Sequence, residues 1–178
     1  MFGATQGAFA TRIAAPEAVL LPVPKEWSFF DAAGLFVTAP TSYAALVHRA
    51  NIKAGDYVLV HAAAGGVGLA AVQIAKAFGA TVIATAGTKK KLEVAKSYGA
   101  DYVVDYRKKD WDADVRKVTP KGRGVDIVYD ETPAKDYSIL ITNDVLQVRP
   151  GRLAGAESEV HGMEWKIACD WFCRRCKS

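Results

Sequence analysis

The sequence predicts an α/β protein built on a Rossmann-like, doubly wound parallel sheet, and three observations predict it. Short β-branched runs alternate with longer amphipathic segments between residues 52 and 130. A glycine-rich segment joins the first of these runs to the helix that follows. The chain has 178 residues, 51% hydrophobic and 24% charged, a composition typical of a globular protein with a packed core.

The first strand of the predicted sheet covers residues 57–61, where a Gly55-Asp56 turn precedes the apolar run YVLVH. Residues 67–78 then place apolar side chains at helical spacing, which predicts an amphipathic helix. Gly79 follows directly, and glycine suits the left-handed position at a helix C-terminus. Together these segments form the first strand and helix of a βαβ unit.

The alternation then repeats along the chain. The expected elements are a strand over 81–85, a helix over 89–98, a strand over 102–106, a helix over 110–118 and a strand over 125–129. Gly99 ends the second helix, and Pro120 stops the third. After Asp130 the alternation fades, so we expect an incomplete sheet that lacks its fifth and sixth strands.

The residues before the first strand of the sheet show a different pattern. Residues 28–36 and 41–50 are expected to form two helices, and residues 7–24 short strands interrupted by prolines. We therefore divide the chain into three parts, which are a β unit with a connecting helix over 1–45, a dinucleotide-binding domain over 46–133 and a divergent tail over 134–178.

Composition and charge argue against several classes of function. The sequence contains no run of about 18 apolar residues, so no membrane span is predicted. The first 16 residues lack the charged-then-apolar pattern of a secretory signal, so a cytoplasmic location is expected. The net charge of +4 is dispersed, and nucleic acid is therefore not the expected partner, although residues 89–91 and 174–177 hold short basic clusters.

The glycine-rich segment is the strongest chemical signal in the chain. Ala62, Gly65 and Gly68 follow the spacing of the dinucleotide-binding fingerprint, with alanine at its first position. Glycines there allow a tight turn and a close approach to a pyrophosphate, which the amides and dipole of the next helix attract. Because a strand precedes the segment and a helix follows it, we interpret it as a dinucleotide site.

The residues after the second strand indicate which dinucleotide is bound. A site for NAD places an acidic residue there to hold the ribose hydroxyls, but this chain has the run Thr88-Lys89-Lys90-Lys91. Hydroxyls and ammonium groups favour an added 2′-phosphate, so NADP(H) is the expected cofactor and Lys91 the preferred phosphate partner. The alternative is that these lysines form the solvated face of a surface helix.

The stretch VLVHAAAGGVGLAAVQIAKAFGATVIATAGTKKKLEVAKSYGAD resembles the zinc-independent quinone oxidoreductase (zeta-crystallin-like) branch of the medium-chain dehydrogenase/reductase family. Upstream, GAFATRIAAPEAVLLPVP resembles the last strands of that family's GroES-like catalytic domain, and FVTAPTSYAALVHRANIKAGD its interdomain helix. Downstream the resemblance reaches VDIVYD, which ends at Asp130. By this resemblance, residues 1–45 are the remnant of the GroES-like domain.

The resemblance implies an NADPH-dependent oxidoreductase that reduces quinones or conjugated carbonyl compounds by hydride transfer, usually as a homodimer. It implies that the pyrophosphate is held by residues of the glycine-rich turn, which are Gly65, Gly66, Val67 and Gly68. It assigns Thr88 and Lys91 to the 2′-phosphate, Tyr106 to the adenosine and Thr41 to the nicotinamide half.

Each of the last two assignments has a structural alternative. Thr41 can cap the helix that follows it, and Tyr106 can be an ordinary aromatic residue at a strand end. His48 and His61 are expected to have structural roles, so no catalytic acid or base is assigned. Nothing in residues 1–133 suggests a zinc site, which agrees with the zinc-independent branch.

Two departures from the family pattern limit the functional expectation. Most of the catalytic domain would precede Met1, and without it the nicotinamide would lose one wall of its site, so this chain alone is expected to be inactive. The alternative function is therefore a non-catalytic NADP(H)-binding fragment. In the tail, Cys169, Cys173, Cys176 and His161 suggest a metal knuckle, whereas a reading frame shifted near residue 157 would encode a strand of the family instead.

Overall fold

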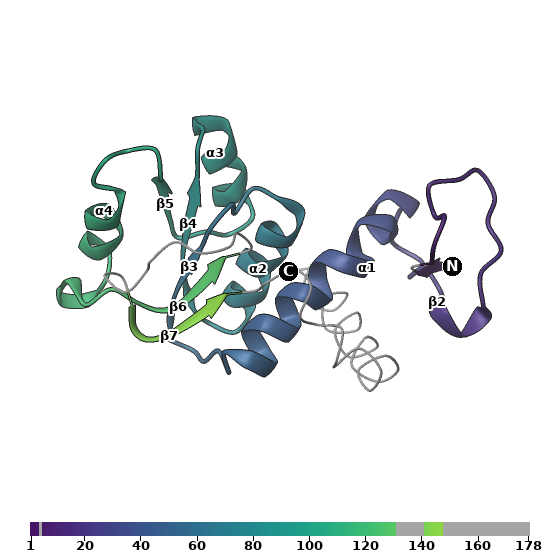
Figure 1. The fold of residues 1–178 in the computed structure, drawn as a ribbon, viewed down its shortest axis with the longest axis horizontal. Helices are drawn as coiled ribbons and strands as arrows, with labels where there is room; N and C mark the ends of the chain where they lie inside the picture. Colours follow the sequence, from purple (N-terminus) through teal and green to yellow (C-terminus); the bar gives the residue numbers. More distant parts are fainter. Residues whose placement is uncertain (4, 131–140, 148–178) are drawn as a thin grey trace.

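The computed structural model describes residues 1–3, 5–130 and 141–147. Among these residues, five strands form one parallel sheet in the order β5-β4-β3-β6-β7, and a two-stranded antiparallel unit lies at the N-terminus (Figure 1). The sheet strands are β3 (Tyr57–Val60), β4 (Thr81–Ala86), β5 (Tyr102–Asp105), β6 (Val125–Asp130) and β7 (Ile141–Gln147). The helices that cover the sheet are α2 (Gly66–Ala77), α3 (Lys89–Ser97) and α4 (Trp111–Lys117).

The alternation of side chains along β3 explains why both faces of the sheet are covered. Val58 and Val60 point into one apolar cluster together with Ala71 of α2 and Ala95 of α3. Leu59 points into a second cluster with Val115 of α4. Successive residues of a strand face opposite sides, so helices pack on both faces and the sheet is doubly wound, as the sequence predicts.

The position of the first strand in the sheet determines where a ligand can bind. The chain runs outward from β3 to β4 and β5, and then returns to place β6 on the other side of β3. Helices on either side of such a reversal diverge and leave a crevice at the carboxyl ends of the strands. The glycine-rich turn follows β3 at this point of the sheet.

Strand β7 corrects the expectation that the fifth strand is missing. It pairs in parallel with β6, with Val128 opposite Val145 and Asp130 opposite Gln147. Asn143 and Asp144 interrupt its apolar pattern, so periodicity did not reveal it. The strand forms because the edge of β6 offers unpaired backbone groups. The tail beyond residue 147, with its cysteines, His161 and the proposed frame shift, lies outside the described residues.

Helix α1 (Phe29–Tyr43) corrects the expectation of two separate helices over 28–36 and 41–50. It runs through Pro40 and continues as a wider π-type turn over Ala44–Arg49, after which the Ala50 amide donates to the Ala45 carbonyl at 2.9 Å. A capping box starts the helix. The Asp31 amide donates to Ser28 Oγ at 3.1 Å, and the Ser28 amide donates to the Asp31 carboxylate at 3.2 Å.

The continuous helix over 29–49 is long and apolar enough to cross a membrane by length and composition alone, which the sequence analysis did not predict. Core helices of globular proteins pass the same test. Here Ala45 and Leu46 lie in the same apolar cluster as Val58 of the sheet, and the helix packs against α2 (Figure 1). Its C-terminal part is therefore a core helix of the fold.

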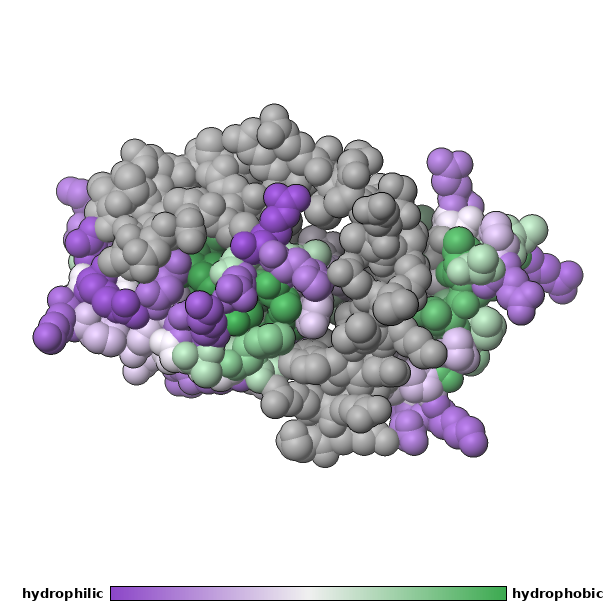
Figure 2. Space-filling view, turned by 90° about the horizontal axis from the view of Figure 1, so that it is seen from below, coloured by the Kyte–Doolittle hydropathy of each residue, from purple (hydrophilic) through white to green (hydrophobic). Residues whose placement is uncertain are grey.

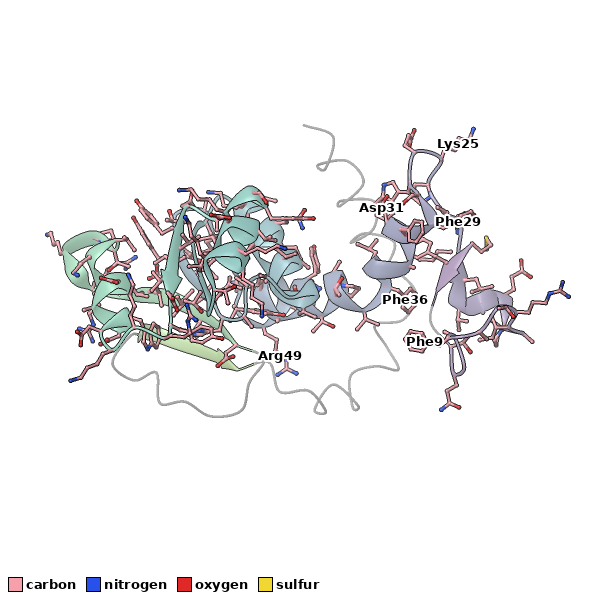
Figure 3. The ribbon with its side chains drawn as sticks, turned by 90° about the horizontal axis from the view of Figure 1, so that it is seen from above. Phe9, Lys25, Phe29, Asp31, Phe36 and Arg49 are labelled. Atoms are coloured by element: carbon pink, nitrogen blue, oxygen red, sulfur yellow. The ribbon has the colours of Figure 1, made fainter. Side chains whose placement is uncertain are left out.

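The N-terminal unit contains less regular structure than the sequence predicts. Its strands are β1 (Phe2–Gly3) and β2 (Leu20–Leu21), with a 3-10 turn at Glu17–Val19, whereas strands were expected over 7–24. Prolines at 16, 22 and 24 remove amides that a longer ladder would need. Figure 3 shows that Phe29 lies at the end of α1 near this unit and Phe36 farther along the helix, while Arg49 lies at the far end.

A small apolar cluster holds the N-terminal unit to the first half of α1. Phe2, Ala32, Leu35 and Ala39 form it, separately from the two clusters of the sheet. The same end of the molecule exposes aromatic side chains, since Phe30 is 91% accessible, and hydrophobic surface is visible there among charged groups (right of Figure 2). The predicted boundary at residue 45 falls inside the continuous helix.

Candidate functional site

The glycine-rich turn is built by hydrogen bonds from three neighbouring strand ends. The Gly65 amide donates to the Ala62 carbonyl at 2.8 Å and closes the turn itself. The Ala63 amide donates to Thr85 at the end of β4, 3.1 Å away, and the His61 amide donates to Tyr129 of β6, 2.9 Å away. The turn is therefore fixed at the crevice where the strand order reverses.

Close packing requires glycine at one position of this turn and leaves little room for a side chain at a second. A Cβ atom on Gly68 would lie 2.7 Å from the Ala62 carbonyl oxygen and 2.8 Å from the Ala63 Cα, which is closer than real Cβ contacts. A Cβ atom on Gly66 would lie 3.1 Å from the Thr38 methyl group of α1. Helix α2 thus begins directly against the turn, with α1 beside it.

The first turn of α2 presents backbone amides that an anion can bind. The first hydrogen bond within the helix runs from the Leu69 amide to the Gly65 carbonyl at 2.8 Å. The amides of Gly66, Val67 and Gly68 precede this bond, and no side chain caps the helix at Gly65. Because the helix dipole adds positive potential at this end, the geometry suits a pyrophosphate.

The basic turn after β4 combines a helix cap with exposed lysines. Thr88 is the N-cap of α3, and its hydroxyl accepts a hydrogen bond from the Lys91 amide at 3.3 Å. The ammonium group of Lys89 lies 3.9 Å from Glu93 in an exposed ion pair. The side chain of Lys91 is exposed in the first turn of α3. A solvated helix face and a phosphate site are both compatible with this placement.

Tyr106, which follows β5, lies against the residue that precedes this basic turn. A Cβ atom on Gly87 would be 2.8 Å from the Tyr106 hydroxyl and 3.1 Å from its ring. Tyr106 is 42% exposed as a whole residue, so part of it remains accessible to a ligand. The structure therefore brings Tyr106, Gly87 and Thr88 together, although 18 residues separate Tyr106 from Thr88 in the sequence.

Beside Tyr106, Asp105 and Arg107 form a bidentate ion pair that sequence reasoning missed. Arg107 Nε lies 3.0 Å from Asp105 Oδ1, and Nη2 lies 2.8 Å from Oδ2. Hydrogen bonds from the Arg107 side chain and amide lower the pKa of Asp105 from 3.8 to about 2. The available sequence signal was an acidic and a basic residue two positions apart at the end of a predicted strand.

Thr41 lies in the interior of α1 and does not cap a helix. Its hydroxyl donates to the Val37 carbonyl at 2.7 Å. Two residues of α1 that reach the glycine-rich turn are Thr38, through its methyl group, and Ser42, whose Oγ lies 2.9 Å from the Val67 carbonyl. The assignment of Thr41 to the nicotinamide half stays a prediction.

Ser42 also connects α1 to the sheet. Its Oγ lies 3.1 Å from the Tyr129 hydroxyl, and both side chains are fully buried. Ser42 thus contacts α2 and β6 at once. Sequence analysis missed this contact because 87 residues separate the two side chains.

The two histidines considered for catalysis are packed against other aromatic rings. His61 Nδ1 lies 2.8 Å from the Thr85 hydroxyl, and its ring meets the Trp111 ring edge-on at 5.4 Å. His48 packs against Tyr43 with ring centroids 5.5 Å apart. Among the described residues, no three His, Cys, Asp or Glu side chains gather in a way that could hold a metal ion.

Comparison with known proteins places this fold among oxidoreductases. Residues 66–141 match the family described as zinc-binding dehydrogenase. A 2-haloacrylate reductase from a Burkholderia species is 40% identical over 126 residues, which cover 70% of this chain and 38% of that protein. The chain spans about half or less of the curated reductases it matches.

Solved structures with the same fold name different cofactors in their descriptions. The quinone oxidoreductase from Thermus thermophilus, described together with its NADPH complex, is 32% identical with a TM-score of 0.68, covering 83% of this chain and 50% of that one. An NAD-dependent alcohol dehydrogenase is 48% identical with a TM-score of 0.65, covering 70% and 36%. With its Rossmann sheet and glycine-rich turn, this chain belongs to the medium-chain dehydrogenase/reductase family, on its quinone oxidoreductase-like branch.

Proposed function

We propose that this chain carries the cofactor-binding part of an NADPH-dependent reductase that acts on quinones or conjugated carbonyl compounds. One observation carries the proposal, which is that the uncapped N-terminus of α2 lies at the reversal of strand order, with a basic turn after the neighbouring strand β4. The first feature suits a pyrophosphate and the second a phosphate on the adenosine ribose.

Each part of the cofactor has a proposed partner in the chain. The amides of Gly66, Val67 and Gly68, together with the Gly65 turn, would hold the pyrophosphate. Thr88 and Lys91 would hold the 2′-phosphate, with Tyr106 beside the adenosine. Thr41 is proposed for the nicotinamide half. NADPH, once bound, supplies the hydride, and the protein positions it and excludes water.

The choice of NADPH over NADH rests on charge at the end of β4. No carboxylate follows Ala86 until Glu93, one turn into α3, and the residues between include three lysines. A site that selects NADH uses a carboxylate to accept hydrogen bonds from the two ribose hydroxyls. Lysines instead attract the dianionic phosphate that distinguishes NADPH.

The Lys91→Glu variant tests this choice. Reversal of the charge should weaken NADPH binding about ten- to a hundredfold, or roughly 1 to 3 kcal/mol, and leave NADH binding nearly unchanged. Lys96→Glu, in the last turn of the same helix, is the matched control and should alter neither. Isothermal titration of both cofactors measures the effect. Equal weakening of NADPH and NADH would remove Lys91 from the phosphate site.

Turnover distinguishes the reductase from the alternative, a non-catalytic NADP(H)-binding fragment. Stopped-flow absorbance at the NADPH band, with a benzoquinone or an enone as acceptor, should show oxidation of the cofactor if the chain reacts. Binding of NADPH without oxidation by either acceptor would favour the fragment. We also propose a cytoplasmic homodimer, and light scattering in solution measures its mass.

A further inference from the structure

The Asp105–Arg107 pair is an ion pair held in a defined geometry. Both carboxylate oxygens of Asp105 accept hydrogen bonds from the guanidinium group, at 3.0 and 2.8 Å, and Oδ1 also accepts one from the Arg107 amide at 3.0 Å. The Asp105 side chain is 20% exposed and the Arg107 side chain 60%. The carboxylate is therefore mostly shielded from solvent, whereas the cation is largely exposed.

The pair lies beside the site proposed for the adenosine ribose. Asp105 is the last residue of β5 and pairs in register with Ala86, the last residue of β4. Parallel neighbouring strands lie about 5 Å apart, so Asp105 ends its strand next to the start of the basic turn. Tyr106, between the two charged residues, reaches across to Gly87. The strand register and this contact thus place the pair at the edge of the sheet where the basic turn begins.

A carboxylate at this position favours the wrong cofactor unless it is neutralised. It would repel a dianionic 2′-phosphate, and it would accept hydrogen bonds from free ribose hydroxyls. We propose that Arg107 binds and neutralises the Asp105 carboxylate and so sets the preference for NADPH. The two residues together are then a specificity determinant of the adenosine site. This inference rests on the proposed function.

Three variants test the proposal by the sign of their effects. Arg107→Gln leaves the carboxylate uncompensated and should weaken NADPH binding about three- to tenfold while NADH binding is unchanged or tighter. Asp105→Asn keeps an acceptor for the Arg107 amide and releases the guanidinium, so NADPH should bind more tightly. The double variant should return close to the unmodified chain. These opposite signs distinguish the proposal from a structural role, in which both single changes weaken both cofactors.

The exposed Asp114–Lys117 pair of α4 provides the matched control, with its atoms 2.9 Å apart. Asp114→Asn and Lys117→Gln should leave the ratio of NADPH to NADH affinity unchanged. Isothermal titration at low and high salt measures all five variants, and the effects of the test variants should shrink at high salt.

The outcomes separate this inference from the proposed function. If the unmodified chain prefers NADPH and Lys91→Glu removes that preference, but Arg107→Gln and Asp105→Asn change both affinities in the same direction or not at all, only the Asp105–Arg107 inference fails. If the unmodified chain shows no preference for NADPH, both proposals fail together.

Discussion

Gly68 is the residue of the glycine-rich turn with the least room for a side chain. An alanine there would push its methyl group into the backbone of Ala62 and Ala63, which cannot move without distorting the turn. We expect Gly68→Ala to lower the free energy of unfolding by about 1 to 3 kcal/mol, as overpacking does elsewhere. It should weaken binding of NADPH and NADH alike. Urea denaturation and cofactor titration measure the two effects.

Gly34 in α1 is the control for this substitution. A Cβ atom there meets nothing within 4 Å, and the backbone is helical. Gly34→Ala should therefore raise the free energy of unfolding by about 0.5 to 1 kcal/mol, because alanine favours the helix. A Gly68→Ala variant as stable as the unmodified chain would show that the turn can relax around the added methyl group.

At the scale of elements, the contact of α1 with α2 and β6 depends on two buried hydroxyls. Ser42 and Tyr129 lie 3.1 Å apart, and Ser42 also contacts the Val67 carbonyl in the first turn of α2. Removal of either hydroxyl leaves the other without that partner in a buried site. The packing of the three elements should therefore make the two side chains interdependent in stability.

A double-mutant cycle measures this interdependence. Ser42→Ala and Tyr129→Phe are each expected to cost about 1 to 2 kcal/mol, and the double variant less than their sum by about 0.5 to 1.5 kcal/mol. Urea denaturation of the four proteins gives the coupling. Strict additivity would mean that the hydroxyls act independently.

How well each element could be predicted from sequence follows from the range of the interactions that form it. The strands at 57–60 and 81–86 matched because β-branched runs and terminal glycines are local signals. The continuity of α1 through Pro40 was not predicted, because a proline usually interrupts a helix. Here the turns on both sides of Pro40 pack on other elements, and the helix continues. Ser42 and Tyr129 gave no signal, because only the fold brings them together.

At the scale of the whole molecule, acid should destabilise the chain in a defined range of pH. Asp105 has a folded pKa of about 2 against 3.8, and the pKa of Asp114 is lowered as well by its hydrogen bond from Lys117. A lowered folded pKa stabilises the native state above the unfolded value, and this contribution is lost as pH falls through the folded pKa. Stability should therefore fall between about pH 4 and pH 2.

Urea midpoints at pH 7, 4, 3 and 2 measure this loss. Asp105→Asn should flatten the curve between pH 4 and pH 2, because the amide does not titrate there. An equally steep curve for that variant would show that other carboxylates cause the acid transition. Since both aspartates are only partly buried and their cationic partners are exposed, high salt should flatten the curve of the unmodified chain.

The uninterrupted helix over 29–49 also has a mechanical consequence. Twenty-one residues at 1.5 Å each give a rod of roughly 30 Å, anchored at one end by the cluster around Phe2 and at the other by Leu46 in the sheet. Thr38 and Ser42 touch the glycine-rich turn near its midpoint. We therefore expect a tilt of the N-terminal unit to shift the α1 residues that contact the glycine-rich turn, so that the two ends of the molecule move together through this helix.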